Sequence, residues 1–186
     1  MASRRPFLVS YRDAMVRVDR IRRADVAVLR EVRLAALADS PGAFASTHER
    51  EAAYDPAEWE RRTVAASTGR SAATFFARDE AGQVVGLVGV FENRVDPMTA
   101  ELVSMWVSPS GRGQGAGSAL VERAIAWASE AEYTRVELWV ARGNDTAERL
   151  YVRSGFYVTG DVQPLPSDPC KDEIRMRLDL AQRRRK

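Results

Sequence analysis

The sequence has very little of the residue types that most often carry nucleophilic, metal or redox chemistry. It contains one cysteine, Cys170, and one histidine, His48. A single cysteine excludes an internal disulfide and a cysteine metal cluster. No serine-nucleophile motif accompanies the histidine, so a Ser-His-Asp triad is not indicated. We predict no metal site, and we expect both residues to lie in loops or on the surface.

Long apolar runs and a strong net charge are also absent. No run approaches the ~20 residues that cross a bilayer, and a net charge of +2 gives no argument for a nucleic-acid partner. The segment Ser3–Leu8 resembles a twin-arginine export signal, but Tyr11-Arg12-Asp13 stands where an apolar h-region should follow. We therefore expect a cytoplasmic protein with no membrane partner.

The length of 186 residues fits one complete core. We expect a flexible N-terminal extension over residues 1–14, a single domain over 15–180 and a frayed, solvated basic tail over 181–186.

The remaining pattern predicts antiparallel strands first and alternating strands and helices later. Helices are expected over 25–39, 56–66, 115–131 and 144–154, and strands over 16–21, 73–78, 83–91, 99–107, 135–140, 156–159 and 173–178. This order indicates a mixed α/β fold with one parallel crossover. The connection 43–55 has no predicted element and is either a substrate lip or a plain linker.

The most informative stretch is Met105–Ser118, where an apolar strand ends at a proline and four alternating glycines lead into a helix. Glycines allow backbone N–H groups to crowd a ligand, and a helix N-terminus favours negative charge. The stretch therefore predicts a phosphate-binding loop.

Three phosphate-binding motifs compete for this loop. A Walker A loop would need a Gly-Lys-Ser/Thr ending, which is missing. A dinucleotide fingerprint is formally present as Gly111-x-Gly113-x-x-Ala116, but three antiparallel strands precede it and only about 70 residues follow it. The segment Arg112–Gly117 resembles the R/Q-x-x-G-x-G/A acyl-CoA loop of the GNAT N-acetyltransferase superfamily. Asn144-x-x-Ala147-x-x-Leu150-Tyr151-x-x-x-Gly155-Phe156 resembles that superfamily's second signature.

The resemblance covers roughly residues 16–178 and implies a GNAT-like central sheet. This sheet is mixed and mostly antiparallel, is flanked by helices, and splays between its fourth and fifth strands, here 99–107 and 135–140. It implies acetyl-CoA as the cofactor, with pantetheine bonded to the bulged strand end and the diphosphate on the loop. The implied cofactor-binding residues are Met105, Trp106, Val107, Arg112, Gly113, Gln114, Gly115, Ala116, Gly117, Ser118, Asn144 and Tyr151.

The implied reaction is direct acetyl transfer to a primary amine in a ternary complex. An alkylamine with a pKa of about 10.4 is neutral in roughly one molecule in 2,500 at pH 7, so a base matters. Glu101 aligns with the catalytic glutamate of some family members and is the candidate base, directly or through water; a surface carboxylate is the alternative. Tyr151 is the candidate acid, or it only hydrogen-bonds the sulfur.

The acceptor's identity stays open. Small-molecule and peptide amines are both compatible with the sequence, and a homodimer is left open. The competing function is a catalytically silent acyl-CoA sensor, against which the presence of both Tyr151 and Glu101 argues.

Overall fold

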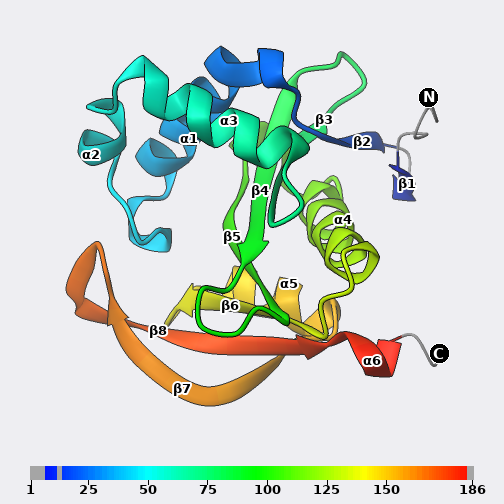
Figure 1. The fold of residues 1–186 in the computed structure, drawn as a ribbon, viewed down its shortest axis with the longest axis vertical. Coiled ribbons are helices and arrows are strands. Elements are labelled where there is room, and N and C mark those ends of the chain that lie inside the picture. Colours follow the sequence, from blue (N-terminus) through cyan, green and yellow to red (C-terminus); the bar gives the residue numbers. More distant parts are fainter. Residues whose placement is uncertain (1–6, 12–13, 184–186) are drawn as a thin grey trace.

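In the described part of the chain, the strands form an eight-stranded sheet around which the helices are arranged (Figure 1). The computed structural model describes residues 7–11 and 14–183, and the strands within them lie in the order β1-β2-β3-β4-β5-β6-β8-β7. The strands are β1 (Phe7–Tyr11), β2 (Ala14–Arg20), β3 (Ala72–Arg78), β4 (Val84–Glu92), β5 (Thr99–Val107), β6 (Arg135–Ala141), β7 (Tyr157–Leu165) and β8 (Asp168–Asp179). The helices are α1 (Val26–Asp39), α2 (His48–Ala52), α3 (Pro56–Thr68), α4 (Ala116–Glu130), α5 (Asp145–Arg153) and α6 (Leu180–Arg183).

The strand pairing confirms the predicted mixed, mostly antiparallel sheet. Neighbouring strands run antiparallel except β5 and β6, which are parallel and are connected through α4. A parallel pair needs such a crossover because the chain must return to the same end of the sheet. In the described part of the chain, no helix is long and apolar enough to cross a membrane.

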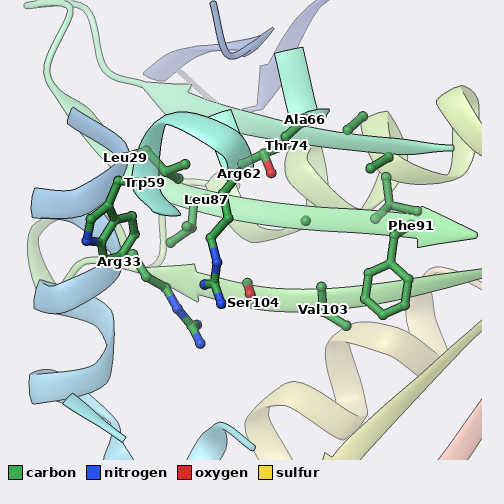
Figure 2. A pocket seen from close by; sticks show the side chains of 14 residues that line it. Leu29, Arg33, Trp59, Arg62, Ala66, Thr74, Leu87, Phe91, Val103 and Ser104 are labelled. Carbon is green, nitrogen blue, oxygen red and sulfur yellow. The ribbon is translucent and has the colours of Figure 1, made fainter. Parts of the chain in front are cut away.

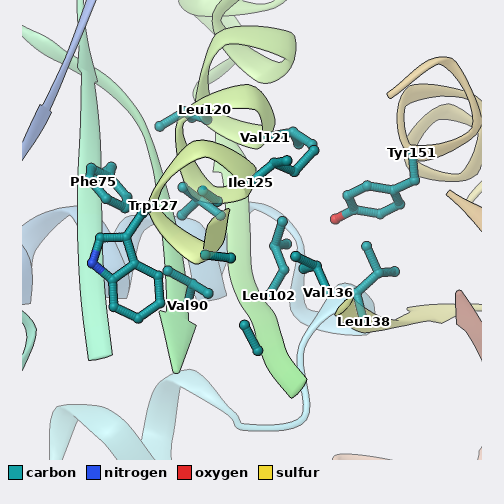
Figure 3. Packing of buried hydrophobic residues seen from close by; sticks show 14 of the residues in the cluster. Phe75, Val90, Leu102, Leu120, Val121, Ile125, Trp127, Val136, Leu138 and Tyr151 are labelled. Atoms are coloured by element: carbon teal, nitrogen blue, oxygen red, sulfur yellow. The ribbon is translucent and has the colours of Figure 1, made fainter. Parts of the chain in front are cut away.

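Alternating side chains of the central strands build two cores, one on each face of the sheet. Phe75 packs in the core under α4 and α5, and the next residue, Phe76, packs in the core under α1 and α3. This alternation follows from the two-residue period of a strand. The helix expected over 115–131 is α4. Its buried face includes Leu120, Val121, Ala124, Ile125, Trp127 and Ala128, of which Figure 3 labels Leu120, Val121, Ile125 and Trp127.

The predicted bulge and splay are both present at β5. Leu87 of β4 pairs with Trp106 and Gly89 pairs with Val103, so one β4 residue faces two residues of β5. Ser104 in this bulge has a φ of 56°. Parallel pairing with β6 ends at Glu101, although both strands continue. The backbone of β5 beyond Glu101 therefore runs along an opening in the sheet.

Three segments differ from the expectation. The last two strands are longer than predicted and form a hairpin around Pro166-Ser167; Pro164 and Gly160 within β7 obscured it, although an edge strand tolerates both. The connection 43–55 contains α2, which begins after Thr47, whose hydroxyl accepts from Arg50 N–H at 3.2 Å. Within the expected extension 1–14, β1 pairs with β2; residues 1–6 and 12–13, like 184–186 of the basic tail, lie outside the described residues.

Candidate active site

A cleft of about 650 Å³ lies between the end of β5, the glycine loop and the two helices α4 and α5. Ten of the predicted cofactor-binding residues line it: Met105, Trp106, Val107, Arg112, Gly113, Gly115, Ala116, Gly117, Ser118 and Asn144. The structure thus brings together residues from both sequence signatures. Gln114 does not line the cleft, because its side chain donates to the Ser110 carbonyl at 2.8 Å.

The glycines of the loop have two different roles. Gly111 is buried, and a Cβ there would lie 2.9 Å from the Val85 Cβ, so this glycine lets the turn pack on β4. Gly113 and Gly115 have φ values of 77° and 81°, which favour glycine, and Gly115 is the N-cap of α4. The first-turn N–H groups of a helix have no intrahelical acceptor. Here they belong to cleft-lining residues, and this arrangement suits a diphosphate.

Arg112 is held by a carboxylate that the sequence did not single out. Its guanidinium group forms an ion pair with Asp39 at the end of α1 and donates to the Val107 carbonyl at 3.1 Å. Asp39 also accepts from Trp106 Nε1 at 2.9 Å, and this hydrogen bond is the main reason that the pKa of Asp39 is lowered. Asp39 thereby ties the loop and the end of β5 to α1.

The second signature places Asn144, Ala147 and Leu150 at the cleft and Tyr151 in the core. Asn144 caps α5, since its Oδ1 accepts from Ala147 N–H at 3.2 Å, and it lines the cleft. Tyr151 lies on the inward face of the same helix, is 5% exposed and packs edge-on against Phe156. Figure 3 shows its ring extending from α5 among the core side chains. Burial raises the pKa of this phenol, and Tyr151 is not a lining residue of the cleft.

A second pocket, of about 500 Å³, adjoins the first where both are lined by Ala43 and Phe44. Its floor is formed by β5 and β6 on either side of the splay, through Glu101, Leu102, Val103, Ser104, Leu138 and Trp139. The connection 43–55 forms one wall, through Ala43, Phe44, Ala45, Ser46, Arg50, Glu51 and Tyr54. This placement favours the substrate-lip interpretation over the plain linker.

Two carboxylates of this pocket come from different strands. Glu101 is half-buried and accepts a hydrogen bond from the Asn93 side chain. Glu173 of β8 is 6% exposed and accepts from Gln163 Nε2 at 2.6 Å, and burial raises its pKa. Sequence reasoning missed Glu173, because it reaches this pocket only through the pairing of β8 with β6. The described residues contain no group of three or more His, Cys, Asp or Glu side chains placed to hold a metal.

Comparison with known proteins agrees with this geometry. The family model "Acetyltransferase (GNAT) family" matches residues 38–156. Mycothiol acetyltransferase of Propionibacterium freudenreichii is 30% identical over 172 residues, which cover 91% of this chain and 52% of that protein. The chain spans between 38% and 52% of the length of the curated relatives it matches.

Two solved structures illustrate the fold. Spermidine N-acetyltransferase from Vibrio cholerae, in complex with CoA and spermine, has a TM-score of 0.71 at 18% identity and covers 89% of this chain and 96% of its own. The protein yncA from Salmonella typhimurium, with its cofactor acetyl-CoA, has a TM-score of 0.68 at 21% identity. The match covers 89% of this chain and 94% of yncA. These likenesses show the fold. Because the family model matches more than half of the sequence, the chain belongs to the GNAT acetyltransferase family.

Proposed function

We propose that this chain is an N-acetyltransferase that moves the acetyl group of acetyl-CoA to a primary amine by direct attack in a ternary complex. The observation that carries the proposal is the meeting of the two cavities: the cleft with the glycine loop and the pocket with the carboxylates share Ala43 and Phe44 beside the opening in the sheet. A donor in one cavity and an acceptor in the other would face each other there.

The cleft fits coenzyme A by shape and by donor chemistry. Positive φ at Gly113 and Gly115 and the first turn of α4 offer backbone N–H groups to a diphosphate. Arg112 would add charge-assisted hydrogen bonds, in exchange for part of its ion pair with Asp39. The backbone of β5 beyond Glu101, which β6 does not pair, would bond the pantetheine arm. When bound, acetyl-CoA supplies the acetyl group as an activated thioester.

The amine must lose a proton as its nitrogen forms the new C–N bond and the C–S bond breaks. Glu101 is the base implied by the family resemblance, and Glu173 is the base that the structure adds. A raised pKa brings a carboxylate closer to the operating pH and makes it a better base. We assign the acceptance of the amine proton to Glu173, directly or through water. Glu101 would hold the amine in place beside it.

The departing thiolate must gain a proton or a hydrogen bond, and Tyr151 is the group proposed to supply it. Its raised pKa makes complete proton transfer to sulfur more uphill than for a free phenol. A neutral, buried phenol is well suited to donate a hydrogen bond instead. We therefore propose that Tyr151 stabilises the sulfur as a hydrogen-bond donor and that its hydroxyl reaches the cleft once the cofactor is seated.

The test is thiol release from acetyl-CoA by the purified chain in the presence of a panel of amines. Cys170 is exposed and would react with a thiol reagent, so the assay uses Cys170→Ser protein. Amine-dependent thiol release, with the acetylated amine seen by mass spectrometry, is expected. If acetyl-CoA binds but no amine stimulates release, the catalytically silent sensor is the correct function.

A further inference from the structure

The pocket of about 500 Å³ beside the cofactor cleft, from here on the acceptor pocket, has walls of opposite charge. Its sheet side carries the carboxylates Glu101 and Glu173, whereas its helical side carries the guanidinium groups of Arg33, Arg50 and Arg62. From this we infer that the acceptor is an amine that also carries an anionic group, as an α-amino acid does. The inference rests on the proposed function and names its substrate class.

The helical wall holds more positive charge than its own carboxylates balance. Glu51, 2% exposed, accepts from Arg33 Nη2 at 2.7 Å and from Arg33 Nε at 3.0 Å, and it lies 3.6 Å from Arg62 Nη1. Arg62 also pairs with Glu58 at 2.7 Å, but Glu58 is shared with Arg61. Among the lining residues of the helical wall, the three guanidinium groups of Arg33, Arg50 and Arg62 therefore face one carboxylate, Glu51.

One donor of this cluster is buried without an acceptor. Arg33 Nη1 has no hydrogen-bond partner in the described part of the chain, whereas the other two nitrogens of the group bond Glu51. A buried donor left in this way costs free energy, which a ligand oxygen would recover if the Arg33 side chain turned toward the pocket. A planar guanidinium group is also the side chain that best matches a carboxylate or phosphonate.

Arg33 and Arg62 direct their charges into one shared space. Both line the acceptor pocket and an adjoining recess of about 280 Å³, whose other common lining residues are Phe91, Val103 and Ser104. Figure 2 shows the two arginine side chains running from α1 and α3 in the same direction, and Ser104 lines the same recess. An anionic group seated there would lie across the pocket from the carboxylate wall.

The two walls together select against simple polyamines. A second ammonium group would meet Arg33 and Arg62, and like charges in a partly buried site repel. An amine with an acid group instead places its nitrogen toward Glu101 and Glu173 and its anion toward the arginines. The charge arrangement therefore determines both which acceptor binds and which end of it faces the thioester.

The experiment compares acceptors that differ only in the acid group. Leucine is paired with 3-methylbutylamine, phenylalanine with 2-phenylethylamine, and alanine with its phosphonic analogue; spermidine represents the polyamines. Values of kcat/KM are calculated from the concentration of the neutral form of each amine, so that differences in amine pKa do not affect the comparison. In the leucine and phenylalanine pairs, the acid-bearing member is expected to be favoured by about tenfold or more, the range of a charge-assisted hydrogen bond.

Variants assign this preference to the cluster. Arg62→Gln should reduce the ratio of acid-bearing to decarboxylated acceptor about tenfold, mainly through KM, and Arg62→Lys should recover part of it. Arg61→Gln is the matched control, because Arg61 is the neighbouring residue, pairs with the same Glu58 and does not line the pocket. Circular dichroism checks that each variant is folded.

The outcomes separate the two proposals. If no amine is acetylated, the proposed function fails. If amines are acetylated but the decarboxylated member or spermidine is preferred, or if Arg62→Gln lowers both members of a pair equally, the acceptor class is wrong while the function stands. Preference for the phosphonate over the carboxylate supports the anionic class and identifies its geometry.

Discussion

Replacing Glu51 by glutamine should destabilise the fold more than any ordinary surface change. Glu51 is 2% exposed and Arg33, its bidentate partner, has a side chain that is 11% exposed. Removing one partner of a buried pair costs about 3–5 kcal/mol, because the other charge stays buried. Glutamine keeps one acceptor oxygen for Arg33, so we expect the lower end, about 3 kcal/mol. That is a large share of the ~5–15 kcal/mol that stabilises a typical domain.

Urea unfolding at pH 7 measures this loss directly. Glu49→Gln is the control, since Glu49 is an exposed residue of the same helix and should change the free energy of unfolding by less than about 0.5 kcal/mol. The double variant Arg33→Met/Glu51→Leu removes both charges and should recover much of the stability. If the free energy of unfolding of the Glu51→Gln variant lay within about 0.5 kcal/mol of the wild-type value, the claim that this pair is buried and bonded would be refuted.

The same pair has a defined pH dependence. Burial alone would raise the pKa of Glu51, but the hydrogen bonds and charge of Arg33 outweigh it, so the pKa is lowered from its ordinary value of 4.5. The stabilisation is therefore complete above that value and is lost as the pH falls through the lower, folded-state pKa. The gap in stability between wild type and Glu51→Gln should be constant near neutrality and should narrow in acid. A gap that widens in acid would contradict this sign.

Three further variants test the catalytic and cofactor assignments. Tyr151→Phe should lower kcat about tenfold or more while leaving the acetyl-CoA Kd nearly unchanged; full activity would make Tyr151 a packing residue only. Glu173→Gln should lower kcat/KM about 100-fold without lowering the free energy of unfolding at pH 7, because burial already penalises its ionised form; unchanged kinetics would return the base role to Glu101. Gly115→Ala and Gly82→Ala both place a side chain at positive φ, at a cost of about 1–2 kcal/mol each, but only Gly115→Ala should weaken acetyl-CoA binding. Equal loss of affinity in both would show that the loop at Gly115 does not contact the cofactor.

Local features of the sequence predicted most of the fold and one of the two cavities. The glycine loop, the amphipathic helix after it and the Asn144 cap depend on residues close together in the chain, so their pattern was readable. The bulge at Ser104 carries no local signal and entered through the family resemblance. β7 was predicted too short because Gly160 and Pro164 lower strand propensity, although an edge strand accepts them.

The acceptor pocket was much less predictable, since its walls come from distant segments. Arg33, Glu51 and Arg62 lie on three different helices, and nothing in their spacing indicates that they share one buried cluster. Asp39 likewise meets Arg112 only because the end of α1 folds against the glycine loop. Such pairings depend on tertiary contacts, which composition and periodicity do not report.

Calorimetric titration with acetyl-CoA and with S-acetylpantetheine, which lacks the diphosphate, tests the central claim most directly. We predict one site per chain for acetyl-CoA and affinity for S-acetylpantetheine that is weaker by about tenfold or more, because the backbone donors after β5 hold the diphosphate. Equal affinity for the two compounds, or binding of NADH by a chain that does not bind acetyl-CoA, would contradict the account.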